Sequence, residues 1–326
     1  MAQLNMVKAL NLAMREAMAE DETVILLGED IGQDEGVFRV TEGLLAEFGA
    51  DRVVDMPVAE SAIAGLALGL SCNGFKPVCE MQFSGFGYCG FAQIENHLSR
   101  YRNRTRGRYT VPVVIRMPYG AGIRAIEHHS ESREAFFAHM PGIKVVIPSG
   151  PRNARALLRA SIFDPDPVIF YEPKACYRAF REEVPDEPET MEIGKAEVVR
   201  EGADVTVISY GASMRPTLEA IEELEDEHDL DPEVIDLLSL TPMDTETINA
   251  SVRKTGRCVI VHEAPRRCGA AAEIIARIVE NSLMFLEAPI KRVTGYDLVM
   301  PFFAMERHYL PDPNKVVAAV REVVSF

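Results

Sequence analysis

The stretch RVVDMPVAESAIAGLALGLSCNG, residues 52 to 74, joins a short apolar run to a helix-like segment at one carboxylate, Glu60. This pattern predicts a strand that leads into a helix. In open α/β sheets such a junction faces the crevice where ligands bind, and a helix N-terminus favours an anion. Glu60 is therefore a candidate site residue, although an acid in the first turn can also serve only the helix dipole.

Composition places the chain among globular proteins with room for two domains. It has 326 residues and a mass of 36.1 kDa, and 47% of the residues are hydrophobic. The formal net charge of −16 argues against a nucleic-acid binder, because such a protein needs a basic face. The charge suits a basic protein partner, or it serves solubility alone.

The cysteines and the N-terminal residues suggest a reducing compartment. The six cysteines form no CxxC pair and no zinc-site spacing, so we expect them to be reduced and mostly buried. Residues 1 to 21 follow helical spacing and lack the basic-then-apolar pattern of a signal peptide, and no apolar run reaches membrane length. We expect a cytoplasmic protein.

Alternating apolar runs and helix-like segments predict the fold class. Leu4, Val7, Leu10 and Met14 recur at three- and four-residue intervals, as in an amphipathic helix, and the strand pattern TVILLG follows at 23–28. Such alternation predicts an α/β fold with a mostly parallel sheet and helices on both faces. Further strands are expected at 52–55, 76–83, 111–117, 143–148 and 167–171.

A charged, proline-rich stretch between residues 178 and 204 predicts a domain boundary. We expect a first domain over residues 1–185, a linker over 186–203 and a smaller α/β domain over 204–326. The strands of the second domain are expected at 204–210, 233–238, 257–263 and 289–295, with a last helix at 312–324.

Residues 85 to 90, GFGYCG, form a literal G-x-G-x-x-G between a predicted strand and a predicted helix, where a dinucleotide fingerprint belongs. Two features count against that function. The unit is not the first strand and helix of its domain, and the next strand, VPVVIRM, ends without the acid that binds ribose. The glycines can instead let another segment or a ligand approach the backbone closely.

Motifs that hold phosphates are missing from the chain. It contains neither a P-loop nor a Gly-Asp-Gly followed by an Asn, the arrangement that could hold a magnesium-bound diphosphate. We therefore expect that this chain does not bind its ligand through phosphates alone.

His128 and His129 are adjacent in IEHHSESREAFFAH. Neighbouring side chains diverge on a helix or strand, and no further His or Cys lies at a suitable local distance, so the pair is a poor metal site. One of the two could donate a proton near neutral pH, and a loop histidine without a chemical role is the alternative.

Six long segments carry a resemblance that is more specific than any short motif. They are GEDIGQDEGVFRVTEGL (28–44), MPVAESAIAGLALG (56–69), EMQFSGF (80–86), EHHSESREAFFAHMPGIKVVIPSGP (127–151), VIFYEPKACYR (168–178) and VHEAP (261–265). In order and spacing they resemble the beta subunit of the thiamin-diphosphate-dependent 2-oxoacid dehydrogenases. That family includes the decarboxylase components of pyruvate and branched-chain 2-oxoacid dehydrogenase. The similarity runs from about residue 4 to the C-terminus.

The resemblance implies a fold, a cofactor and partners. It implies a transketolase-type pyrimidine-binding domain followed by a transketolase C-terminal domain. In the family an alpha subunit with the Gly-Asp-Gly motif holds magnesium and the diphosphate of thiamin diphosphate, so the two chains form an α2β2 heterotetramer. The acyl group formed from the 2-oxoacid passes to the lipoyl-lysine of a dihydrolipoyl acyltransferase.

The resemblance also implies roles for residues of the first domain. Glu60 aligns with the glutamate that hydrogen-bonds a ring nitrogen of the aminopyrimidine and favours its imino tautomer, so that the cofactor can remove its own thiazolium proton. Phe86 falls where relatives place an aromatic ring against the pyrimidine. Gln82 is expected to line the pocket, and Glu29 to lie just behind it.

The resemblance also implies roles for His129 and Asp164. His129 aligns with the histidine that protonates the dithiolane during acyl transfer to lipoyl-lysine. The family usually has Leu or Tyr where this chain has His128, which leaves two candidate imidazoles. Some relatives bind a structural potassium ion near the segment that matches SIFDPDP (161–167), which makes Asp164 a candidate ligand.

Other functions stay open alongside the decarboxylase. One is a scaffold or regulatory homologue that pairs with an alpha-like partner but has no turnover; the retention of Glu60, Phe86 and His129 argues against it. The other is a dinucleotide-dependent oxidoreductase built on GFGYCG. The preferred 2-oxoacid stays undetermined, because one or two methylenes in a pocket contribute only about 1 to 3 kcal/mol.

Overall fold

The computed structural model describes all 326 residues, which divide into two compact units. The first unit consists of residues Met1–Tyr119 and Phe136–Ile193, and the second of Gly120–Ala135 and Gly194–Phe326. The chain thus enters the second unit for sixteen residues, returns to the first, and enters the second again. No helix combines the length and the apolar character needed to cross a membrane.

A parallel sheet forms the centre of the first unit. Its strands run in the order β6 (Lys144–Val146), β7 (Val168–Pro173), β5 (Val114–Tyr119), β4 (Lys76–Glu80), β2 (Val24–Gly28) and β3 (Val53–Asp55). All residues of β2, β5 and β7 are buried, as expected for strands covered on both faces.

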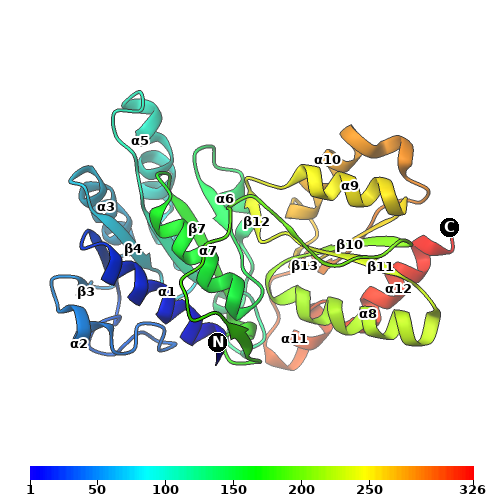
Figure 1. The fold of residues 1–326 in the computed structure, drawn as a ribbon, viewed down its shortest axis with the longest axis horizontal. Helices are drawn as coiled ribbons and strands as arrows, with labels where there is room; N and C mark the ends of the chain where they lie inside the picture. Colours follow the sequence, from blue (N-terminus) through cyan, green and yellow to red (C-terminus); the bar gives the residue numbers. More distant parts are fainter. The chain divides into compact units, whose positions relative to one another are not determined.

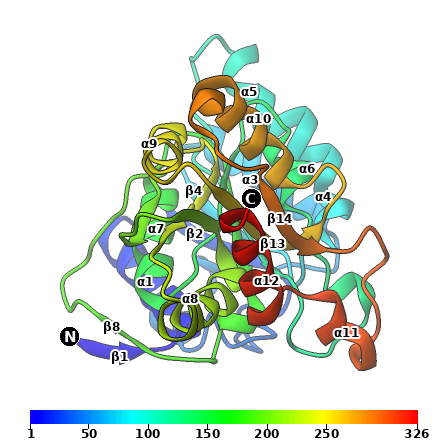
Figure 2. The same ribbon diagram turned by 90° about the vertical axis from the view of Figure 1, so that its right-hand side faces the viewer.

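Helices cover both faces of this sheet (Figures 1 and 2). On one face α1 (Met6–Glu20) packs against α7 (Pro151–Phe163), and on the other α3 (Glu60–Cys72) packs against α4 (Gly87–Gln93). Asn5 caps α1 by accepting a hydrogen bond from the Lys8 amide. This part of the chain also contains the short α-helices α2 (Leu44–Phe48), α5 (Ser99–Arg104) and α6 (Glu134–Ala138).

The second unit repeats the plan on a smaller scale. Its sheet has the order β14 (Lys291–Gly295), β13 (Cys258–Pro265), β10 (Val205–Ser209), β11 (Pro232–Asp236) and β9 (Glu197–Arg200), and only β9 is antiparallel. The helices α8 (Met214–His228) and α12 (Pro313–Val324) lie on one face, with α9 (Thr245–Thr255) and α10 (Ala270–Ser282) on the other (Figure 2). The unit also contains β12 (Ser239–Thr241) and α11 (Phe303–Tyr309).

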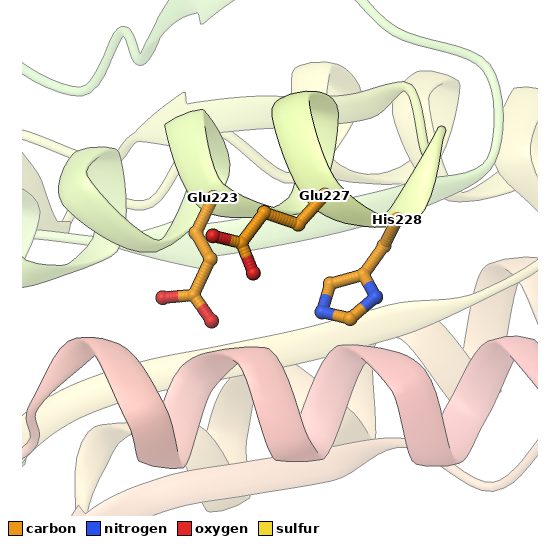
Figure 3. A group of neighbouring side chains, drawn as sticks. All are labelled: Glu223, Glu227 and His228. Atoms are coloured by element: carbon orange, nitrogen blue, oxygen red, sulfur yellow. The ribbon is translucent and has the colours of Figure 1, made fainter.

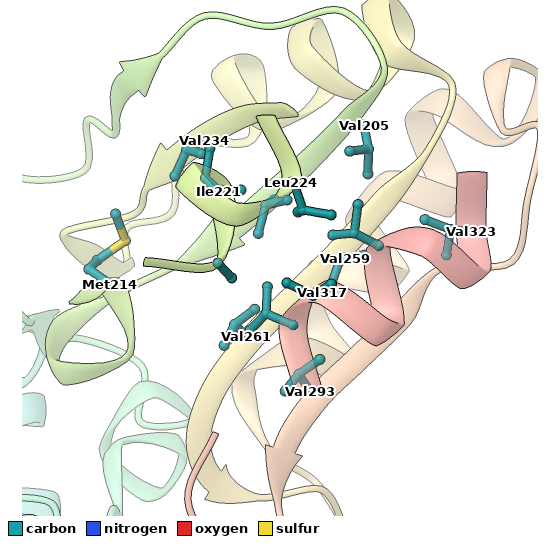
Figure 4. Packing of buried hydrophobic residues seen from close by; sticks show 14 of the residues in the cluster. Val205, Met214, Ile221, Leu224, Val234, Val259, Val261, Val293, Val317 and Val323 are labelled. Carbon is teal, nitrogen blue, oxygen red and sulfur yellow. The ribbon is translucent and has the colours of Figure 1, made fainter. Parts of the chain in front are cut away.

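Valines dominate the core between the sheet of the second unit and its helices α8 and α12 (Figure 4). Val205, Val259 and Val261 of the sheet meet Leu224 of α8 and Val320 of α12, all of them buried. Branched side chains from strands and helices fill this layer without polar atoms, so burial of apolar surface stabilises the unit.

The ten strands expected from the sequence are all present, and both sheets confirm the α/β fold class. Four short strands were not expected, among them β1 (Ala2–Leu4), which pairs with β8 (Glu182–Val184), and β9. The strands β1, β8 and β9 are edge strands with few buried residues, so they lack an apolar run. All six cysteines are free as expected, but only Cys79, Cys176 and Cys258 are buried.

A buried ion network ties together three central strands of the first unit. Arg116 of β5 donates from Nε and Nη2 to the two carboxylate oxygens of Glu172 in β7, at 2.6 and 3.0 Å, and from Nη1 to Glu80 of β4 at 2.7 Å. The Tyr177 hydroxyl donates to Glu172 at 2.5 Å. All four side chains are buried, and the guanidinium offsets the cost of burying the two carboxylates away from water.

Candidate functional site

Three of the residues predicted to form the site follow neighbouring strands of the first unit. Glu29 comes directly after β2, Glu60 begins α3 after β3, and Gln82 lies two residues after β4. Because β3, β2 and β4 are adjacent and parallel, their carboxyl ends lie at one edge of the sheet. Ligands of open α/β sheets bind at this edge, so the fold brings these residues to one region.

Glu29 and Glu60 form the electrostatic centre of this edge. Only 3% of Glu29 and 7% of Glu60 is exposed. Burial raises the pKa of Glu29, the Glu60 carboxylate raises it further, and the backbone N–H of Ala59 opposes both. One oxygen of Glu29, Oε1, is buried without a hydrogen-bond partner. A buried acceptor of this kind suits a polar ligand group beside Glu60.

Gln82 and Phe86 lie on the turn between β4 and α4. The Gln82 side chain donates from Nε2 to Asp30 Oδ2 at 2.8 Å, which links it to the residue after Glu29. Phe86 is half-buried, and its ring meets that of Phe83 edge to face with centroids 5.7 Å apart. The Phe83 ring also meets that of Phe38, with centroids 5.5 Å apart, so the turn carries part of an aromatic cluster.

The glycines of GFGYCG lie where helix α4 packs closely against its neighbours. A Cβ on Gly90 would stand 3.1 Å from the backbone oxygen of Glu60, and one on Gly87 would stand 2.9 Å from the Met117 sulfur. Packing thus accounts for both positions without a dinucleotide. The same contact places α4 directly against Glu60, the first residue of α3.

His128 and His129 belong to the second unit, in a short turn formed by Glu127–His129. The backbone N–H of His129 donates to the Ile126 oxygen at 3.1 Å, and that of Ser130 donates to Glu127 at 2.9 Å. Both imidazoles are half-buried, and their ring centroids are 4.3 Å apart in an edge-to-face arrangement. The sequential pair thus forms one compact imidazole cluster.

Asp164 lies away from the other predicted site residues of the first unit. It follows α7 and precedes β7, so it stands at the amino edge of the parallel sheet, opposite the edge of Glu29 and Gln82. Both of its carboxylate oxygens accept from Lys144 Nζ, at 2.8 and 2.6 Å. The lysine supplies the positive charge that a potassium ion would otherwise bring to this carboxylate.

One group of three side chains has the composition of a metal site. Glu223, Glu227 and His228 near the end of α8 bring their ligand atoms within 4.8 Å of one another (Figure 3). The group is partly exposed on a helix rich in acidic residues, as is typical of a solvated helix face. Exposed acids of this kind are common without a metal, and we assign no function to them.

Three buried acids of the second unit escaped the sequence reasoning: Glu134, Glu263 and Glu306. Each contacts a residue far from it in the sequence, and such contacts have no local pattern. A signal existed for Glu263, because it ends the strand predicted at 257–263 much as Glu29 follows TVILLG, although β13 itself continues to Pro265. An acid at that place in an α/β sheet is a candidate functional residue.

Comparison with known proteins identifies both units. The family model "Transketolase, pyrimidine binding domain" matches residues 2–179, and "Transketolase, C-terminal domain" matches residues 194–316. In solved structures the fold recurs in a split gene transketolase, described as an inactive beta4 tetramer. That chain superposes with a TM-score of 0.81 over 99% of both chains at 24% identity.

Full-length relatives define the family. The pyruvate dehydrogenase E1 component subunit beta of Bacillus subtilis (strain 168) is 48% identical over all of both chains. The subunit of the same name from Acholeplasma laidlawii is 46% identical over 99% of this chain and 98% of its own. The chain therefore belongs to the family of pyruvate dehydrogenase E1 beta subunits, and it is a 2-oxoacid dehydrogenase component with transketolase-type domains.

Proposed function

We propose that this chain works with an alpha subunit in the thiamin-diphosphate-dependent oxidative decarboxylation of a 2-oxoacid and in acyl transfer to lipoyl-lysine. The full-length similarity to E1 beta subunits carries this proposal, and pyruvate is the first substrate to test because those relatives are named for it. Branched-chain 2-oxoacids are the next substrates to test. The cytoplasmic location stays a prediction.

The carboxyl edge of the first unit suits the pyrimidine half of the cofactor. Glu60 would accept a hydrogen bond from the pyrimidine ring, Phe86 would pack on the ring, and Glu29 offers the buried oxygen Oε1 to a polar group. Gln82 would fix the turn between β4 and α4 through its hydrogen bond to Asp30. When bound, thiamin diphosphate supplies a carbon nucleophile for the 2-oxo group and accepts the electron pair that carbon dioxide leaves behind.

The diphosphate and magnesium are assigned to the alpha subunit in this proposal. This chain carries no Gly-Asp-Gly followed by an Asn, so it offers no motif for a magnesium-bound diphosphate. A potassium ion at Asp164 stays a prediction, and the ion pair with Lys144 does not favour it. The C-terminal domain is proposed to dock the acyltransferase, since the net charge of −16 suits a basic binding domain.

Reconstitution tests the division of labour. We expect the chain alone to show no decarboxylation of pyruvate with an artificial electron acceptor, and the mixture with its alpha subunit to be active. The physical reason is that this chain would hold only half of each cofactor. Activity of the lone chain would contradict the shared site. A stable but inactive complex across a panel of 2-oxoacids would instead favour the scaffold alternative.

Replacement of His129 separates the two half-reactions, which are decarboxylation of the 2-oxoacid and acyl transfer to lipoyl-lysine. In the reconstituted complex we expect His129→Ala to keep decarboxylation with an artificial acceptor and to slow reductive acylation of a lipoyl domain by about 100-fold, since a departing thiolate needs an acid nearby. His128→Ala is the matched control, because its ring lies 4.3 Å away on the same turn. Equal losses in both assays for His129→Ala would indicate a cofactor-binding role instead.

A further inference from the structure

The segment that carries the two histidines does not belong to the first unit, although it follows a strand of that unit in the sequence. Residues 120–135 follow β5 of the first unit, yet they belong to the second unit. Within them only the turn at Glu127–His129 and the start of α6 are helical. The Gly120 amide donates to the Glu131 oxygen at 3.2 Å and so joins the two ends of the segment. Side chains from the rest of the second unit also contact it.

Three hydrogen bonds with carboxylates attach this segment to the second unit. Before the histidines, the Gly122 amide donates to Glu306 Oε1 at 3.1 Å. After them, the Ser132 hydroxyl donates to Glu263 Oε1 at 2.5 Å, and the Tyr210 hydroxyl donates to Glu134 Oε1 at 2.7 Å. The contacts therefore bracket His129 on both sides.

Burial makes these contacts strong. Glu134 is fully buried, and Glu263, Glu306, Ser132 and Tyr210 are each at most 8% exposed. Water cannot replace a lost partner at such positions, so removing one partner leaves a buried polar group unsatisfied. The backbone also approaches Glu263 closely, since Gly120 has a φ of +80° and a Cβ there would overlap that carboxylate.

Apolar packing beside the segment is incomplete. A cavity of about 170 Å³ lies beside it. Its lining includes Ser130 and Ser132 of the segment and Glu263, Leu298, Val299 and Met300 from the rest of the second unit. A close-packed interior would hold the segment by shape alone. Here Ala121 packs against Met300 and Tyr309, and the directional polar contacts add to that packing.

We infer that the pairs Ser132–Glu263 and Tyr210–Glu134 are positioning contacts that hold His129 for proton donation to the lipoyl thiolate. The inference rests on the proposed function, because it concerns the second half-reaction of that site. It adds residues of the C-terminal domain to the machinery of acyl transfer. These residues touch neither substrate nor cofactor and act through the backbone of residues 120–135.

Hydrogen exchange measures the attachment directly. In the reconstituted complex we expect Ser132→Ala and Tyr210→Phe each to speed amide exchange in peptides covering residues 120–135 by about tenfold or more. The control is Ser251→Ala, which removes a buried hydroxyl bonded to Thr206 at 2.7 Å elsewhere in the second unit. Exchange no faster than in the control would overturn the inference.

Kinetics must agree with the exchange result. Ser132→Ala and Tyr210→Phe should lower kcat for reductive acylation of a lipoyl domain by about 10- to 100-fold, because small misplacements of an acid cost that much. The KM for the lipoyl domain and the rate of decarboxylation should stay within about twofold of the Ser251→Ala control. A merely structural defect would lower both half-reactions together, and that result would overturn the inference.

The His129→Ala variant tells the two proposals apart. If it slows acyl transfer while Ser132→Ala and Tyr210→Phe behave as Ser251→Ala does, the role of His129 stands and the positioning contacts are refuted. If His129→Ala leaves acyl transfer unchanged, the role of His129 fails and the positioning inference fails with it. Slow transfer in all three variants, with decarboxylation retained, supports both.

Discussion

Glu60→Gln, reconstituted with the alpha subunit, is expected to lose decarboxylation by at least about 100-fold, while the heterotetramer still assembles. Glutamine has the size of glutamate but carries no charge and cannot exchange a proton with a pyrimidine nitrogen, so the imino tautomer would lose its support and the cofactor its activation. The measurement is decarboxylation of a 2-oxoacid with an artificial electron acceptor, together with the mass of the complex in solution.

The matched control is Glu246→Gln. Glu246 is an exposed acid in the first turn of α9, so its charge serves the helix dipole. Loss of such a charge costs about 0.3 to 1 kcal/mol of stability and should leave turnover intact. If Glu60→Gln behaved like Glu246→Gln, with normal turnover and slightly lower stability, then Glu60 would serve only its helix.

Arg116→Met should produce the largest loss of stability. The exchange leaves Glu80 and Glu172 buried without their cation, and breaking a buried ion pair from one side costs about 3 to 5 kcal/mol. We expect the melting transition of the first unit to fall by on the order of 10 °C in differential scanning calorimetry at neutral pH. The control is Arg100→Met, whose exposed pair with Glu95 should contribute at most about 1 kcal/mol.

The pH dependence of that variant gives a second check. Burial raises the pKa of Glu80, and Arg116 lowers it, so removing Arg116 raises this pKa further. A carboxyl with a raised pKa in the folded state destabilises the fold above that pKa and regains stability as the pH falls through it. The deficit of Arg116→Met should therefore narrow on mild acidification. A deficit that matched Arg100→Met, or that grew on acidification, would refute the role assigned to the network.

The sequence alone predicts the central sheets well, because their strands are buried on both faces and appear as apolar runs. TVILLG, for example, predicts β2 (Val24–Gly28) to within one residue. The sequence does not predict β8 and β9, because their residues lie in a charged, proline-rich stretch. Edge strands gain their stability from pairing with distant residues, and a local pattern does not contain that pairing.

The sequence likewise predicts some residues of the candidate site and misses others. Glu29 and Glu60 could be found from the sequence because each stands at the end of a strand or the start of a helix, where α/β folds place ligands. The contacts of Glu263, Glu306 and Tyr210 could not be foreseen, since their partners lie 131, 184 and 76 residues away along the chain. The membership of residues 120–135 in the second unit likewise has no local signature.

The double crossing of the chain limits how this protein can be cut into fragments. A fragment that starts at Gly194 would separate Tyr210, Glu263 and Glu306 from Glu134, Ser132 and Gly122, which would remain on the other piece. A single break after Ile193 would thus expose to solvent several acids that are buried in the intact molecule. Faithful dissection of the two halves requires a permuted or grafted chain in which residues 120–135 travel with the C-terminal half.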